Sequence, residues 1–126
     1  MIDPVAGWYA YVAGQDRDAL DALLSDDVVL HSPAIHTPIW GKSETAGYIA
    51  AIMQLLGDRP VQHIGEWRDD RSAVIEFCGR IHGLEVHGVN LLHWNADGRI
   101  VDFTMMIRPL QAIHAAALRI GSDEPV

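Results

Sequence analysis

The chain has 126 residues, of which 49% are hydrophobic, and its formal net charge is −8 at pH 7. This length and apolar content fit a single core, so we read residues 1–126 as one domain. Because acidic side chains predominate and the basic ones are scattered, the attraction that supplies most nucleic-acid affinity is missing, and we expect no nucleic-acid partner.

The sequence also bears on the cellular compartment. No apolar run approaches the roughly 18 residues that span a bilayer. Asp3 stands where a secretory signal would carry positive charge, so we expect neither a membrane nor export. The single cysteine, Cys78, cannot form an internal disulfide, which fits a reducing compartment. Cytoplasm is the expected location.

The first half of the chain has helical periodicity. From Pro4 to about Leu24, apolar residues recur at helical spacing around a polar turn at residues 14–16, which predicts two short helices. The stretch "VVLHSP" predicts a short strand stopped by Pro33, followed by the loop "AIHTPIW". The segment "GKSETAGYIAAIMQLLG" carries a broad apolar stripe and predicts a longer helix that ends at Gly57.

The second half changes to the period of strands. The runs "VQHIGEWRDD", "SAVIEFCGRIH", "LEVHGVNLLHW" and "RIVDFTMMI" are separated by short polar turns and predict an antiparallel meander. "RPLQAIHAAALRI" predicts a closing helix with Pro109 in its first turn, and residues 120–126 predict a frayed tail. Helices first and strands afterwards indicate an α+β fold.

Strand periodicity assigns the side chains of this meander to two faces. On the inner face, toward the helices, we expect an apolar surface with one polar interruption, Asn90. The outer face carries Val89, Leu91, Thr104 and Met106 and is too apolar to be comfortably solvated. Because such a patch commonly marks a subunit contact, we expect a homodimer through the outer face of the sheet.

The order of these elements resembles the SnoaL-like branch of the nuclear-transport-factor-2-like superfamily. The resemblance covers nearly the whole chain and is sharpest in "GLEVHGVNLLHWNADGRIVDFTMMIRPLQAI", with support from "GQDRDALDALLSDDVVLHSP" and "WGKSETAGYI". It implies a cystatin-like, cone-shaped α+β barrel in which a curved antiparallel sheet wraps round a long helix. It also implies a pocket inside the cone and often a dimer packed on the outer face of the sheet. Relatives include polyketide cyclases, ketosteroid isomerase, limonene-epoxide hydrolase, scytalone dehydratase and non-catalytic binding domains, so the fold does not choose the function.

Three functional positions of ketosteroid isomerase have changed in this chain. The resemblance places Ser32 at the carboxylate base, Asn90 at the protonated acid and Trp8 at the tyrosine donor. A serine has no useful basicity without an adjacent base, and the tryptophan donates one hydrogen bond without exchanging a proton. We interpret Asn90 as the polar floor of an apolar pocket. The alternative is a buried amide satisfied by neighbouring backbone or by Trp8.

Among seven histidines, His63 is our first choice for a catalytic base, with Asn90 as the second catalytic residue. In one of two possible registers, His63 shares a strand face with Gly65 and Trp67. For each histidine taken singly, the alternative is a surface or hydrogen-bonded core side chain. The outward parity of Asp102 excludes it from the expected pocket.

The expected pocket lining combines these polar positions with large apolar side chains, which would also serve as ordinary core. The expected ligand-binding residues are Trp8, Ser32, Trp40, Tyr48, Met53, Phe77, Asn90 and Met105. No zinc motif and no phosphate-cradling glycine loop is present, so we expect neither a metal nor a cofactor.

Three functions stay open at this point. The first is a pocket protein that binds a small, mostly apolar molecule through Asn90, Trp8, Ser32 and His63. The second is a cofactor-free isomerase, cyclase, dehydratase or hydrolase that acts on a polyketide-, steroid- or terpenoid-like substrate by acid–base catalysis. There Asn90 and Trp8 would hold a developing oxyanion and a histidine would move the proton. The third is a structural dimerisation module with a filled core.

Overall fold

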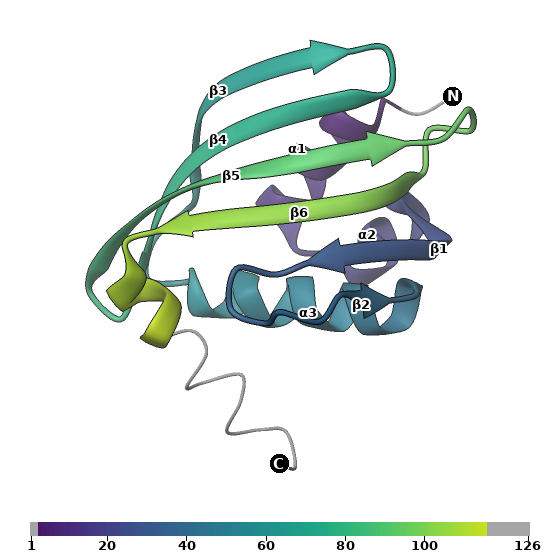
Figure 1. Cartoon of the computed structure of the whole chain (residues 1–126). Helices are drawn as coiled ribbons and strands as arrows, with labels where there is room; N and C mark the ends of the chain where they lie inside the picture. The colour runs from purple at the N-terminus through teal and green to yellow at the C-terminus, as the bar shows by residue number, and fades with distance from the viewer. Residues whose placement is uncertain (1–2, 116–126) are drawn as a thin grey trace.

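The computed structural model describes residues 3–115 of the chain. Its three helices precede most of the sheet in sequence and are α1 (Pro4–Gly14), α2 (Arg17–Leu23) and α3 (Lys42–Leu55). The strands are β1 (Leu24–His31), β2 (Ile39–Trp40), β3 (Gln62–Asp69), β4 (Ser72–Ile81), β5 (Leu84–Trp94) and β6 (Ile100–Arg108). The strands form one sheet that curves over the helices, which confirms the predicted α+β class (Figure 1).

Local sequence explains where the first two helices begin. The Asp3 carboxylate accepts a hydrogen bond from the Val5 N–H at 3.0 Å, and the Asp16 carboxylate accepts one from the Asp18 N–H at 3.0 Å. Each cap satisfies an N–H group that has no partner inside its helix. Pro4 stands at the first position of α1, where its missing N–H leaves no bond unmade. The two predicted N-terminal helices are therefore confirmed.

The strand order is β2-β1-β6-β5-β4-β3, and the predicted meander of β3 to β6 is antiparallel throughout. The expectation of a wholly antiparallel sheet is wrong at one place, because β1 pairs in parallel with β6. After the three hairpins of the meander, β6 runs in the same direction as β1. The predicted loop "AIHTPIW" contains a further edge strand, β2, whose Ile39 pairs with Leu30. The sheet is open, with β2 and β3 as its edges.

The core fills the space between the inner face of the sheet and the helices. The largest fully buried side chains come from both layers and are Trp8, Tyr11, Leu20, Leu24, Leu30, Ile49, Ile52, Ile75, Phe77, Ile81, Leu92 and Phe103. Burial alternates residue by residue along β4, as expected for a strand with one covered face. Residues 110–115 are helical, as predicted, whereas the remainder of the predicted closing helix and the expected frayed tail lie outside the described residues.

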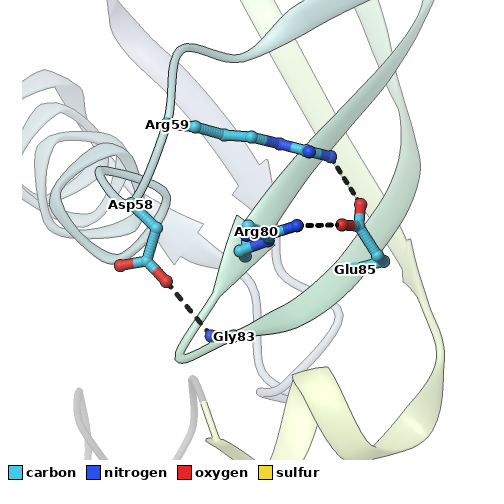
Figure 2. Close-up of polar contacts among 5 residues, drawn as sticks. All are labelled: Asp58, Arg59, Arg80, Gly83 and Glu85. Carbon is cyan, nitrogen blue, oxygen red and sulfur yellow. Dashed lines mark hydrogen bonds and ion pairs between the residues drawn. The ribbon is translucent and has the colours of Figure 1, made fainter.

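A charged cluster fastens the β4–β5 hairpin to the segment after α3 (Figure 2). Arg59 and Arg80 each donate to the Glu85 carboxylate, at 2.5 and 2.6 Å, and the Gly83 N–H donates to Asp58 at 3.1 Å. The hydrogen bond from Arg80 is the main cause that lowers the pKa of Glu85. This cluster ties the tip of the hairpin to the end of the helix that covers the sheet.

Two negative observations apply to residues 3–115. No helix there is long and apolar enough to cross a membrane. The same part of the chain holds no group of three His, Cys, Asp or Glu side chains arranged to bind a metal ion.

Candidate functional site

Asn90 lies in the middle of β5, on the inner face of the sheet, as its strand parity predicts. Its Cα partners are Ile75 on β4 and Met105 on β6, and its own side chain is 3% exposed. Among residues 3–115, its Oδ1 atom has no hydrogen-bond partner. A buried acceptor without a partner is uncommon in proteins and calls for an explanation.

Trp8 supplies an unpartnered donor to the same region. Its indole packs edge-on against Phe103, with ring centroids 5.1 Å apart, and is 2% exposed. Phe103 pairs with Leu92, which lies next to Asn90 along the inner face of β5, about 7 Å away along the strand. Within the described chain the indole Nε1 has no hydrogen-bond partner either. The expected alternative, in which Trp8 satisfies the amide of Asn90, is therefore wrong.

Ser32 and Tyr48 meet at the end of β1. Ser32 follows the last residue of the strand, and its hydroxyl shares a hydrogen bond with the Tyr48 hydroxyl from α3. The Ser32 oxygen also accepts from the Ala34 N–H at 3.1 Å. His31 pairs with Thr104, so Ser32 follows at the level of Met105, which borders Asn90. The two hydroxyls are thus near the interior but already bonded, and within residues 3–115 the Ser32 hydroxyl makes no hydrogen bond to a basic side chain.

Thr45 is a polar residue of the interior that the sequence reasoning did not single out. It is fully buried in α3, and its hydroxyl oxygen finds no hydrogen-bond partner in the described part of the chain. It precedes Tyr48 by three residues, so the two side chains lie on one face of the helix. That spacing is the feature of the sequence that could have identified Thr45, because it places the Thr45 hydroxyl on the apolar stripe of the helix.

Most of the expected apolar lining is brought into the interior. Met53, Phe77 and Met105 are at most 5% exposed. Phe77 lies over Gly88, where a Cβ would stand 2.7 Å from the ring. Trp40 is an exception and a wrong expectation, because it is 68% exposed. It pairs with Val29, whereas its neighbour in β2 pairs with the fully buried Leu30, so the alternation of the strand turns Trp40 away from the core.

His63 faces inward on the edge strand β3, but not with the neighbours expected for it. His63 pairs with Phe77 and Gly65 with Glu76, so Ile64 is the extra residue of a β-bulge. Beyond the bulge the parity is reversed, which puts Glu66 on the inner face. The expectation that His63 shares a face with Gly65 and Trp67 is therefore wrong.

The polar surroundings of His63 come from α1. The Tyr9 ring lies against the imidazole, with centroids 4.6 Å apart, and its hydroxyl donates to Glu66 at 2.6 Å. Burial lowers the pKa of His63. Burial, together with the hydrogen bond to Glu66, raises the pKa of Tyr9 to about 12. At neutral pH the imidazole is therefore uncharged and the phenol protonated.

The outer face of the sheet carries the apolar residues predicted for it. Val89 pairs with Met106 and Leu91 with Thr104, and Met106 is 55% exposed. Asp102 is also turned outward, as expected, and lies 3.4 Å from the His31 imidazole.

The comparisons with solved structures agree with this architecture. A steroid delta-isomerase from Pseudomonas aeruginosa is 30% identical over 94% of this chain and 87% of its own, with a TM-score of 0.87. A bacterial protein with a cystatin-like fold from Silicibacter pomeroyi DSS-3 is 23% identical over 95% of this chain and 86% of its own, with a TM-score of 0.85. A protein with a ketosteroid isomerase-like fold from Catenulispora acidiphila DSM 44928 is 21% identical over 97% of both chains, with a TM-score of 0.68.

The family itself follows from a match of sequence. No curated protein matches the chain. The family model of the SnoaL-like domain matches residues 5–103, which run from the second residue of α1 to the first part of β6 and include the inner-face residue Asn90. With that match over most of its length, the chain belongs to the SnoaL-like family.

Proposed function

We propose that this chain binds a small, mostly apolar molecule and holds one neutral oxygen of that molecule between Trp8 and Asn90. The observation that carries the proposal is the pair of buried polar atoms without partners, one a donor and the other an acceptor. Leaving such atoms unpaired costs about 1–3 kcal/mol each, and a bound ligand removes that cost. The surrounding side chains, Ile75, Phe103 and Met105, are buried and apolar.

The two atoms favour a particular ligand chemistry. A ligand hydroxyl accepts from the Trp8 N–H and donates to the Asn90 Oδ1 at the same time. If the amide is turned over, its NH₂ group and the indole N–H both donate to a ligand carbonyl. An unpaired carboxylate is disfavoured, because burying a charge among apolar side chains costs far more than burying a neutral oxygen.

A matched pair of probes tests this. We expect 2-naphthol to bind the full-length protein, as followed by calorimetry, and naphthalene to bind at least ten-fold more weakly because it lacks the oxygen. Asn90→Leu should lower the affinity for 2-naphthol by about ten-fold or more and leave the affinity for naphthalene almost unchanged. Ser72→Ala, which removes a hydroxyl from the outer face of the same sheet, is the control. Equal affinities for the two probes, or no binding of 2-naphthol, would overturn the proposal.

A second candidate function is isomerisation of such a ligand, with Asn90 and His63 as catalytic residues. Its support is the 30% identity to a steroid delta-isomerase over nearly the whole chain. Two preorganised donors also suit an oxygen that becomes negative during the reaction. Conversion of a β,γ-unsaturated 3-ketosteroid to its conjugated isomer, followed by ultraviolet absorbance, tests it. A rate no higher than that in buffer would leave binding alone as the function.

We also propose that the protein works as a homodimer joined through the outer face of the sheet. The support is the apolar character of this outer face, which carries Val89, Leu91, Thr104 and Met106. Trp67 also lies outward beyond the bulge and is 59% exposed. Apolar patches of this kind are characteristic of subunit contacts. A location in the cytoplasm stays a prediction.

A further inference from the structure

We infer that His63 is the proton acceptor of the interior site and that Tyr9 and Glu66 are positioning residues that hold its imidazole in place. The inference deepens the second candidate function and rests on the proposed binding of a ligand between Trp8 and Asn90. It supplies a base that Ser32 does not, because the Ser32 hydroxyl is already hydrogen-bonded to the Tyr48 hydroxyl and to the Ala34 N–H.

The β-bulge at Ile64 creates the arrangement. In a regular strand His63 and Glu66 would point to opposite faces, because they are three residues apart. The extra residue brings both onto the inner face, where His63 pairs with Phe77 and Glu66 pairs with Ile75. Ile64 itself is 53% exposed. Bulges are common beside functional sites, where they redirect a side chain.

Two inward residues of β3, His63 and Glu66, are connected to the proposed ligand site across the sheet. Ile75, the partner of Glu66, is also the partner of Asn90, and Phe77, the partner of His63, is also the partner of Gly88. His63 is therefore two strands and one inner-face step from Asn90, a Cα separation of roughly 12 Å from standard strand spacings. A bicyclic ligand held at Asn90 and an imidazole side chain together span such a distance.

Helix α1 contacts the His63 imidazole through Tyr9. Tyr9 follows Trp8 directly, contacts the His63 ring, and donates to Glu66 at 2.6 Å. The Glu66 carboxylate also lies 3.7 Å from the Arg68 guanidinium, which in turn pairs with Asp3 at the start of α1. The residue that would hold the ligand oxygen and the residue that orients the base are therefore neighbours on one rigid helix.

The protonation states suit the assigned roles. Burial lowers the pKa of His63, so the imidazole is neutral and able to accept a proton at pH 7. Tyr9 keeps its proton, because burial and Glu66 raise its pKa to about 12. Within residues 3–115, His63 makes no hydrogen bond or ion pair, whereas the imidazoles of His31 and His87 lie beside carboxylates.

The proton transfer balances without a co-reactant. A C–H bond next to the ligand carbonyl breaks, its electron pair moves onto the oxygen between Trp8 and Asn90, and the proton goes to His63. The imidazolium then returns the proton to a carbon of the same ligand, which restores the carbonyl and the neutral imidazole. Exchange of that proton with solvent in the meantime makes the step measurable.

The experiment uses 2-tetralone, an enolisable ketone of the same ring size as 2-naphthol, in D₂O. The rate of deuterium incorporation at its α carbons is followed by NMR for the full-length protein. We expect His63→Gln to slow the protein-catalysed exchange at least 100-fold, the usual contribution of a general base. Binding of 2-naphthol should change less than about two-fold, because the ligand oxygen is held elsewhere. His87→Gln, on the outer face, is the matched control.

Tyr9→Phe tests the positioning role, because it keeps the ring contact and removes the bond to Glu66. We expect a smaller loss of exchange, about ten-fold, and a displaced midpoint in its pH profile, with Glu66, Arg68 and Asp3 as the neighbouring charged groups. If 2-naphthol binds but His63→Gln exchanges as fast as the wild type, or the wild type exchanges no faster than buffer, the inference is overturned and the binding proposal stands. If 2-naphthol does not bind, both are overturned.

Discussion

Replacing Asn90 by leucine should stabilise the protein and at the same time weaken ligand binding. The Asn90 Oδ1 atom is buried and, within the described residues, has no partner. Removing an unsatisfied buried polar atom returns about 1–3 kcal/mol, while a volume-conserving change in a packed core usually costs less than about 1.5 kcal/mol. We therefore expect the free energy of unfolding to rise by about 1–2 kcal/mol, which corresponds to a Tm higher by about 4–8 °C for this length of chain.

Asn95 provides the matched comparison, because it is the same residue type just beyond the same strand. Its side-chain oxygen accepts from the N–H groups of Asp97 at 3.0 Å and Arg99 at 3.1 Å. Asn95→Leu should therefore lower the free energy of unfolding by about 1–2 kcal/mol, because two backbone donors lose a partner. Urea unfolding of both variants without ligand, read by far-ultraviolet circular dichroism, measures the difference. A loss of stability in Asn90→Leu as large as that in Asn95→Leu would show that the amide is a structural hydrogen-bonding group and would refute the reasoning.

Three further results are expected. Gly88→Ala should lower stability by about 1–3 kcal/mol in urea unfolding, because its Cβ would stand 2.6 Å from the backbone oxygen of Met106 and 2.7 Å from the Phe77 ring; wild-type stability would contradict the close packing. Sedimentation velocity should show a dimer that Met106→Glu or Trp67→Lys dissociates, and a wild-type monomer at micromolar concentration would remove the proposed interface. For His63, whose folded-state pKa lies below the unfolded value of 6.5, protonation favours the unfolded chain, so wild-type stability should fall relative to His63→Gln as the pH drops through 6.5 and below; parallel stability curves would refute the assigned shift.

Much of the fold follows from local periodicity. The helices, the meander and the inward direction of Asn90 need only the spacing of apolar residues, which the chain keeps over runs of seven or more residues. The parallel pairing of β1 with β6 was not predictable in this way. Which strand lies beside β1 is decided by the path of the chain through three hairpins, and the local spacing of apolar residues carries no information about that path.

The candidate site was less predictable, because small irregularities decide it. One extra residue, Ile64, exchanges the faces of everything that follows in β3, and alternation alone cannot reveal it. The glycine at position 65 is the one sign of this bulge in the sequence, because a Cβ there would lie 2.7 Å from the Trp67 ring. Trp40 belongs to a strand of two residues, which is too short for a periodic signal. The proposed site combines Asn90 with Trp8, which lies more than 80 positions away in sequence.

The parallel pairing of β1 with β6 also constrains the order in which the chain folds. The hairpins of β3 to β6 are contacts between neighbours in sequence and form quickly, whereas β1 must close a loop of about 70 residues to reach its partner. During synthesis, helices α1 and α2 and strand β1 leave the ribosome long before β6 is made. Their apolar surfaces therefore stay uncovered until β6 can pair with β1. Trp8 packs against Phe103 of β6 only when this last strand is in place. Fluorescence of Trp8 in a protein lacking the other tryptophans would thus report completion of the sheet during folding.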